Sequence, residues 1–386
     1  MTTAFVIGAR GFVGRNLCVF LRQHENVRLI EFDVDTPPEI LDKGLHESDV
    51  IFHLAGVNRP EKEEDFTVGN VSVTKDICDR LQTFGRAPII IFSSSIQAEL
   101  DNPYGISKRK AEEVLMQYGE TSGATVIIFR IKNIFGKWCR PNYNSVVATF
   151  CHNIVRDLPI IISDPDKIIE LVHIDDVCSA MMNASGLYSR TPCTIGIGGE
   201  DIFKEITPVF KISLGELAET IKKFKNFRAN LRVPEFDDPF IYRLYATYLS
   251  YLDGNDFAYG LDVKTDARGS LAEFLKSESF GQVFISRTKP GITRGNHYHH
   301  TKAEKFFVVQ GKALIRFRHI QRDEIIEHAV SGEDFRVVDI PPGYTHSIEN
   351  VGNEELVTIF WANEIFDQEK QDTFFDKVVN ITGDKS

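Results

Sequence analysis

The chain has 386 residues, of which 42% are hydrophobic and 26% charged, and its formal net charge is −11. This length suits two or three domains, each with its own hydrophobic core. Because the balance is acidic and lysine and arginine form no block, nucleic acid and an anionic membrane surface are not expected as partners.

Short apolar runs alternate with longer amphipathic stretches over residues 4–200. The runs are almost continuously apolar, as expected of strands covered on both faces of a sheet. Helical patterns between them include residues 70–84 and 104–118. The alternation predicts an α/β domain of the Rossmann type with a parallel, doubly wound sheet. The five runs are residues 4–7, 27–32, 49–55, 88–94 and 125–130.

The second half of the chain has a different texture. Residues 213–227 predict a helix, because Ser213 and Glu216 form a capping box, and the aromatic-rich residues 228–262 are expected to form a helical connector. Short strands separated by glycine and proline turns follow from about residue 263, which predicts an all-β barrel or jelly roll. Its clearest strands are residues 282–287, 305–311, 312–318, 335–343 and 356–362.

The sequence shows no signal-peptide pattern and no apolar run of membrane-spanning length, so a cytoplasmic protein without membrane insertion is expected. Six cysteines lie in the first half and form no C-x-x-C pair. We expect reduced, mostly buried thiols rather than disulfides or zinc ligands. The cysteines are residues 18, 78, 139, 151, 178 and 193.

A glycine-rich segment, G-x-x-G-x-x-G, lies between the first strand and the first helix. Glycine suits a backbone that turns sharply and approaches a pyrophosphate, and the following helix N-terminus supplies N–H donors. A tight turn is the plain alternative, but the strand–turn–helix context favours a dinucleotide site. The candidate cofactor-binding residues in this segment are Gly8, Arg10, Gly11, Phe12 and Gly14.

Two residues give opposite indications about the cofactor. Asp33 follows the second strand, where an acidic residue binds the ribose 2′-hydroxyl and favours NAD. Arg10, inside the glycine segment, could instead meet the 2′-phosphate of NADP. The residues alone leave this choice open.

Tyr104 and Lys108 form a Y-x-x-x-K pair on one face of a predicted helix, with Asn102 as its N-cap and Pro103 in its first turn. Free tyrosine titrates near pH ~10, and a nearby ammonium lowers that pKa towards neutrality. The serines at 93–95 end a strand just upstream and could supply a hydroxyl to a reacting carbonyl. An ordinary surface pair is the alternative, which the upstream glycine segment disfavours.

These residues resemble the extended short-chain dehydrogenase/reductase family, whose members act on nucleotide sugars. Further similar segments are residues 53–56, 130–136 and 172–177. The resemblance implies that Tyr104 donates a proton, that Lys108 holds the nicotinamide ribose and lowers the tyrosine pKa, and that Ser95 or Ser94 orients the substrate carbonyl. It also implies that Leu54 and Ala55 line the cofactor and that Asn133 faces the substrate.

Two spaced motifs in the predicted barrel match those of cupins: G-x5-H-x-H-x4-E-x6-G from Gly291 and P-x-G-x2-H-x3-N from Pro341. Histidines two apart on a strand point the same way, so both reach one ion. Three imidazoles and a carboxylate suit zinc, our first choice, or another divalent transition metal such as manganese, iron or nickel. Surface histidines in a polar loop are the alternative, and His300 could replace a neighbour. The expected ligands are His297, His299, Glu304 and His346.

Residues 266–273 and 294–298 also resemble nucleotide-deoxysugar 3,5-epimerases, which are cupins too. That resemblance implies that His297 is a base and that Arg294 binds substrate phosphate. His297 therefore has two competing roles. The ligand role is favoured because the other three residues complete a metal set.

The whole pattern resembles bifunctional capsular-polysaccharide enzymes, in which such a reductase is fused to a cupin. It implies cupin epimerisation, at C3, of a UDP-linked 4-keto-2-acetamido-2,6-dideoxyhexose, and then reduction with NADPH rather than NADH towards UDP-N-acetyl-L-fucosamine, by a homodimer. The domains are then residues 1–245 with NAD(P) and substrate sites, a connector at 246–262 and the cupin at 263–380. Arg140 and Asn144 are expected to contact sugar or diphosphate, unless they are plain loop residues. The alternative is a single-activity reductase or epimerase whose cupin is a structural, dimerising or sensing module.

Overall fold

The computed structural model describes residues 1–60, 62–187, 202–369 and 371–379. The chain divides into two compact units, residues 1–222 with 243–252 and residues 223–242 with 253–386. In the described part of the chain, no helix is both long enough and apolar enough to cross a membrane. The five described cysteines carry free thiols, four of them buried, and the expectation for Cys193 lies outside the described residues.

A parallel sheet forms the centre of the first unit, in the order β2-β1-β3-β4-β5-β8. The five predicted runs form the first five strands at nearly the expected bounds, which confirms the doubly wound α/β prediction. Since β2 and β3 lie on opposite sides of β1, the topological switch point lies between β1 and β3, where such sheets bind ligands. The strands are β1 (Thr2–Ile7), β2 (Val27–Phe32), β3 (Val50–His53), β4 (Ile89–Ser95), β5 (Val126–Ile131) and β8 (Phe203–Lys204).

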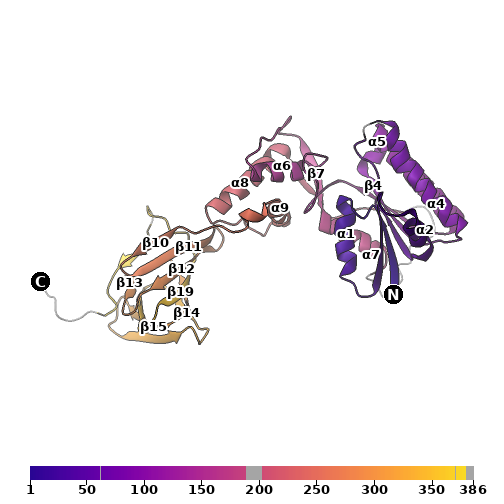
Figure 1. Ribbon diagram of the computed structural model, residues 1–386. Helices are drawn as coiled ribbons and strands as arrows, with labels where there is room; N and C mark the ends of the chain where they lie inside the picture. Colours follow the sequence, from indigo (N-terminus) through magenta and orange to yellow (C-terminus); the bar gives the residue numbers. More distant parts are fainter. Residues whose placement is uncertain (61, 188–201, 370, 380–386) are drawn as a thin grey trace. The chain divides into compact units, whose positions relative to one another are not determined.

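Helices cover both faces of this sheet (Figure 1), which explains the continuous apolar runs. One face packs against α1 (Phe12–Arg22) and α7 (Ile174–Ala184). The other packs against α2 (Pro38–Glu47), α4 (Val73–Thr83) and α5 (Pro103–Ser122). Strand β2 differs from the prediction because it is an edge strand, and its side chains are only partly buried.

Smaller elements complete the first unit, except that η3 belongs to the second unit and α8 and α9 each contribute to both. The capping box is confirmed, because Ser213 Oγ accepts the Glu216 N–H and Glu216 Oε2 accepts the Ser213 N–H. Helix α9 and the short η3 occupy part of the expected helical connector. The elements are α3 (Glu64–Phe66), the π-helical η1 (Thr67–Ser72), η2 (Ile96–Glu99), the strands β6 (Asn133–Phe135), β7 (Ile168–His173) and β9 (Phe210–Ser213) of a small sheet, α6 (Val146–Val155), α8 (Leu214–Ala229), α9 (Pro239–Leu249) and η3 (Gly254–Asp256).

Two antiparallel sheets form the second unit, in the orders β10-β11-β12-β19-β14-β17 and β16-β15-β18-β13-β20. Phe306 and Phe360 of one sheet and Ile315 and Ile348 of the other lie in one buried cluster, so the sheets enclose a common core, as predicted for a cupin. The strands are β10 (Val263–Asp266), β11 (Gly269–Ser277), β12 (Gly281–Thr288), β13 (Thr293–Tyr298), β14 (Glu304–Gln310), β15 (Lys312–His319), β16 (Ile325–Ser331), β17 (Val337–Ile340), β18 (Tyr344–Asn350), β19 (Leu356–Ala362) and β20 (Phe374–Phe375).

Candidate functional site

The glycine segment connects β1 directly to α1. Gly8 has a φ of 89°, and a Cβ there would lie 2.7 Å from the backbone nitrogen of Ala55. A Cβ on Gly14 would lie 2.0 Å from the carbonyl oxygen of Gly8, so only glycine lets α1 start this close to the turn. Helix α1 begins at Phe12, after Gly11, without a side-chain cap. Its first N–H groups can therefore meet an anion.

The two residues that bear on cofactor choice lie beside each other. The carboxylate of Asp33 accepts the backbone N–H of Arg10 at 2.7 Å and that of Val34 at 2.9 Å, so it shapes the turn. The guanidinium of Arg10 pairs with Asp35, and the Arg10 side chain is 63% exposed. Arg10 is thus held at the mouth of the glycine segment, and it is open to solvent.

The predicted Tyr104 and Lys108 lie on α5 beside the end of β4. Asn102 caps this helix, since its Oδ1 accepts the Gly105 N–H at 2.8 Å, and Pro103 is the first helical residue, as predicted. The Lys108 ammonium is buried and donates to the Ser93 carbonyl at 2.7 Å. The Tyr104 hydroxyl is hydrogen-bonded to the side chain of Ser95. The structure therefore brings the tyrosine, the lysine and one of the candidate serines together.

The titration of this group differs from the expectation. Burial raises the pKa of Tyr104 above its usual value, and the hydrogen bond with Ser95 acts in the opposite direction. Burial also lowers the pKa of Lys108 to about 8, against the attraction of Glu112. The predicted lowering of the tyrosine pKa by Lys108 is not found, because the ammonium points to the Ser93 carbonyl and lies near Glu112.

Ser94 and Ser95 have different surroundings. Ser94 is buried, and its hydroxyl donates to Glu112, which also accepts from Arg130 at 2.7 Å. Adjacent residues of a strand point to opposite faces, so only one serine can meet Tyr104. Ser95 is the serine on the face towards Tyr104, and Ser94 belongs to a buried polar network with Glu112 and Arg130.

Sequence reasoning did not find Asn70, a buried residue of the π-helical segment η1. Its amide accepts the Val57 N–H at 2.9 Å and donates to the Ser107 hydroxyl at 2.9 Å. Asn70 therefore ties the loop after β3, which carries the predicted Leu54 and Ala55, to the helix that carries Tyr104 and Lys108. π-helical turns are frequent at functional sites, but no residue spacing in the sequence predicts this one.

The candidate substrate residues lie on exposed segments of the first unit. Asn133 donates to the Glu170 carbonyl at 3.1 Å, and Asn144 is exposed. The Arg140 guanidinium lies 5.0 Å from the centre of the Tyr143 ring. Arg59, which sequence reasoning missed, donates to the Tyr143 carbonyl and lies 6.0 Å from the same ring. Two guanidinium groups thus gather at Tyr143, a suitable place for a diphosphate.

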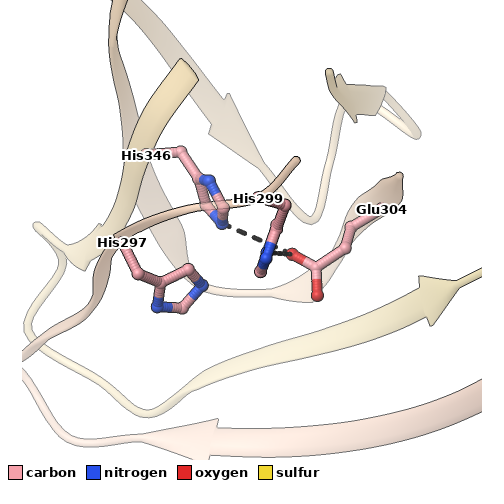
Figure 2. A group of neighbouring side chains, drawn as sticks. All are labelled: His297, His299, Glu304 and His346. Carbon is pink, nitrogen blue, oxygen red and sulfur yellow. Dashed lines mark ion pairs between the residues drawn. The ribbon is translucent and has the colours of Figure 1, made fainter. Parts of the chain in front are cut away.

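The four predicted metal ligands come together in the barrel (Figure 2), with ligand atoms within 4.8 Å of one another. His297 lies on β13, His299 just after it, Glu304 at the start of β14 and His346 on β18. Glu304 Oε2 lies 3.4 Å from His299 Nε2 and 3.3 Å from His346 Nε2. The alternative of surface histidines in a polar loop does not describe His299, which is buried.

The chemistry of this group fits a divalent metal. The Nε2 atoms of His299 and His346 are buried and make no hydrogen bond. Their Nδ1 atoms face backbone carbonyls, of Asp372 and Tyr344, and so act as donors, which in the neutral rings makes Nε2 the atom with a free lone pair for a metal. Burial and the neighbouring imidazoles lower the pKa of His297 to about 3, so its ring is neutral, as a ligand must be.

Arg294 lies on the same strand as His297. Its Nε donates to Thr288 Oγ1 at 2.9 Å. Burial and the charge of Arg268 lower the pKa of Arg294, so these two guanidinium groups lie near each other. Both positions belong to the segments that resemble 3,5-epimerases. The spare His300 packs against Phe374, with 4.8 Å between ring centres, and is not part of the four-residue group.

Comparison with known proteins agrees with both halves of this structure. Residues 4–193 match the NAD dependent epimerase/dehydratase family, and residues 264–374 match the polysaccharide biosynthesis C-terminal domain. The fold and these matches define a fusion of an NAD-dependent epimerase/dehydratase domain with a C-terminal cupin of polysaccharide biosynthesis.

Full-length relatives narrow the class. The chain is 44% identical over 370 residues, 96% of this chain and 97% of the relative, to the UDP-2-acetamido-2,6-beta-L-arabino-hexul-4-ose reductase of Pseudomonas aeruginosa strain PA103. The crystal structure of the capsular polysaccharide assembling protein CapF from Staphylococcus aureus superposes with a TM-score of 0.88 at 46% identity, over 97% of this chain and 99% of that chain. A structure of CapF with the inhibitor 3-isopropenyl-tropolone gives 0.84 at 42% identity, over 97% and 100%. The chain belongs to the CapF family, as the sequence predicts.

Proposed function

We propose that this chain is a bifunctional nucleotide-sugar enzyme. Its cupin epimerises a UDP-linked 4-keto-2-acetamido-2,6-dideoxyhexose at C3, and its first domain then reduces the 4-keto group with NADPH, towards UDP-N-acetyl-L-fucosamine for capsular polysaccharide. The observation that carries the proposal is the Ser95–Tyr104–Lys108 group, in a chain 44% identical along nearly its whole length to a reductase of such a sugar. The protein works in this proposal as a homodimer.

The reductase residues have complementary tasks. NADPH, when bound, supplies the hydride. Tyr104 donates its proton to the carbonyl oxygen as the carbon is reduced, and Ser95, hydrogen-bonded to Tyr104, orients that oxygen. Lys108 holds the nicotinamide ribose through its buried ammonium, which lies one helical turn from Tyr104. Arg140, Asn144 and Asn133 hold the UDP-sugar.

The preference for NADPH rests on Arg10. Its guanidinium is exposed beside the glycine segment, and its backbone is positioned by Asp33. Asp33 uses both carboxylate oxygens on backbone N–H groups, so it is less suited to select a ribose 2′-hydroxyl. A 2′-phosphate would compete with Asp35 for the Arg10 guanidinium.

The cupin residues suit carbon inversion next to a ketone. The 4-keto group acidifies the neighbouring C3–H, so a base can remove that proton if the developing oxyanion is stabilised. His297, His299, Glu304 and His346 would hold a zinc ion or a related divalent metal, which when bound supplies a Lewis acid for that oxygen. Arg294, on the strand of His297, is placed in this proposal to hold substrate phosphate.

One experiment tests both activities. NADPH oxidation is measured with a panel of 4-keto UDP-sugars, for the wild type and for Tyr104→Phe. Deuterium uptake at C3 and C5 is then followed by NMR in D₂O with full-length Tyr104→Phe, which keeps the cupin but cannot complete reduction. Oxidation by the wild type together with uptake at C3 is the expected result. Oxidation without uptake would leave a single-activity reductase, with a structural or sensing cupin.

A further inference from the structure

The C-terminal segment 371–379 crosses the second unit beside the group of three histidines and one glutamate, although neither cupin motif includes it. Its strand β20 pairs with β13, with Phe375 opposite His297 and Phe374 opposite Tyr298. The Phe374 ring stacks on Tyr298 with 5.4 Å between centres. The segment therefore adds the outermost strand to the sheet that carries His297 and His346.

Asp372 clamps the loop that follows β13. Its carboxylate accepts the backbone N–H groups of His300 at 2.9 Å, Thr301 at 2.7 Å and Lys302 at 2.8 Å, and the Thr301 hydroxyl at 3.0 Å. One side chain thus orders residues 300–302 of the connection between His299 and Glu304.

The backbone of Asp372 acts on His299 directly. Its carbonyl oxygen is hydrogen-bonded to His299 Nδ1, and a carbonyl can only accept. Nδ1 is therefore the donor of this hydrogen bond, so in the neutral imidazole the buried Nε2, which lies 3.4 Å from Glu304, is the atom that can bind a metal. Hydrogen bonds of this kind set the tautomer and ring orientation of metal-binding histidines.

A second anchor lies four residues further on, at Asp376. Its carboxylate accepts from the guanidinium of Arg318 at 2.6 Å and from the hydroxyl of Thr345, the neighbour of His346. Its backbone N–H donates to the carbonyl of Asn296, the neighbour of His297, at 2.9 Å. Val378 is buried beyond it, with 1% of its side chain exposed. The segment is thus tied next to three of the four proposed ligands.

We propose that residues 372–378 form a positioning strap of the cupin metal centre, with Asp372 as its main positioning residue. The strap orders the loop from His299 to Glu304, selects the His299 tautomer and holds β13 against β18. It rests on the proposed metal centre and adds to it a source of metal affinity outside the two cupin motifs. Substitution of residues that hydrogen-bond to metal ligands weakens metal binding by roughly 10- to 100-fold.

The test measures Zn²⁺ affinity of metal-stripped, full-length protein by competition with a chromophoric chelator. Asp372→Ala removes the clamp without touching a ligand. Asp323→Ala, in the exposed loop between β15 and β16 of the same barrel, is the matched control. Co²⁺ spectra of the same proteins report ligand geometry, and thermal unfolding of the metal-free forms reports general stability. Thr345→Val, which removes one contact of Asp376, is a second variant should Asp372→Ala not fold.

The expected result is zinc affinity about 10- to 100-fold lower in Asp372→Ala, an altered Co²⁺ spectrum and wild-type affinity in Asp323→Ala. Thr345→Val is expected to lower the affinity in the same direction. Wild-type affinity and spectrum in whichever of these two strap variants folds would overturn the strap. A wild type that binds neither Zn²⁺ nor Co²⁺ would instead overturn the proposed metal centre itself, and the strap with it, so the two failures are distinguishable.

Discussion

The ammonium of Lys108 lies 2.7 Å from the carbonyl oxygen of Ser93, at the end of the strand that also presents Ser95 to Tyr104. This contact places a buried positive charge next to the proposed proton donor. Its burial lowers the pKa of Lys108 to about 8. The charge of the site therefore depends on pH within a range accessible to assays.

The first prediction concerns this pH dependence. A lysine whose pKa is lowered to about 8 is charged below that pH and loses its charge as the pH rises through it. Since the charged ammonium holds the ribose in the proposed mechanism, kcat/KM for reduction should fall above about pH 8. The profile is measured with NADPH in the wild type and in Lys108→Arg, which stays charged and should not show this limb. A wild-type profile that stays level through pH 8 would contradict the assignment.

A second prediction separates the two serines. Ser95→Ala and Tyr104→Phe should each lower kcat, the latter by roughly 100-fold or more, because a general acid contributes that much. Ser94→Ala should leave kcat close to wild type and lower the thermal midpoint, because it removes a partner of the buried Glu112. Steady-state kinetics and thermal unfolding of the three variants check this. Equal kinetic losses in both serine variants would mean that Ser95 has no special role.

The third prediction concerns cofactor choice. Arg10→Ala should raise KM for NADPH by roughly 10-fold or more, because it removes one charge-assisted contact with the 2′-phosphate. It should leave KM for NADH nearly unchanged. Asp35→Asn should do the opposite and lower KM for NADPH, because it releases the Arg10 guanidinium from its ion pair. Kinetics with both cofactors measure the effect. Equal changes for NADH and NADPH would show that Arg10 does not read the 2′-phosphate.

Metal removal gives the fourth prediction. Stripping the metal with a chelator, or the substitution His346→Ala, should abolish deuterium uptake at C3. Adding Mg²⁺ to the stripped protein should not restore the uptake, because Mg²⁺ disfavours imidazole ligands. Reduction of a substrate already epimerised at C3 should continue at its normal rate, since the Ser95–Tyr104–Lys108 group holds no metal ligand. Loss of both activities on stripping would contradict this division of tasks.

The sequence predicted those parts of the sites that short spacing defines. The glycine segment, the Tyr104–Lys108 pair and the His297–His299 pair each lie within one element, where helix or strand geometry determines which side chains share a face. The apolar runs likewise predicted the central strands, because each is covered on both faces. The choice between Ser94 and Ser95 needed the structure, since it depends on which face of β4 meets α5.

Contacts between distant residues could not be predicted. Arg59 and Tyr143 are 84 residues apart, and Asp372 lies 70 to 72 residues from the backbone groups it clamps. The sequence separation of such residues does not show that they are in contact, because the entropic cost of closing a loop rises only slowly with its length. The lowered tyrosine pKa was expected from sequence spacing alone, which does not show that the ammonium of Lys108 faces a backbone carbonyl.

NADPH oxidation with 4-keto UDP-sugars tests the central claim most directly. We expect oxidation that depends on a 4-keto-2-acetamido-2,6-dideoxyhexose linked to UDP and that is lost in Tyr104→Phe. The absence of oxidation with every sugar of the panel, or an undiminished rate in Tyr104→Phe, would contradict it.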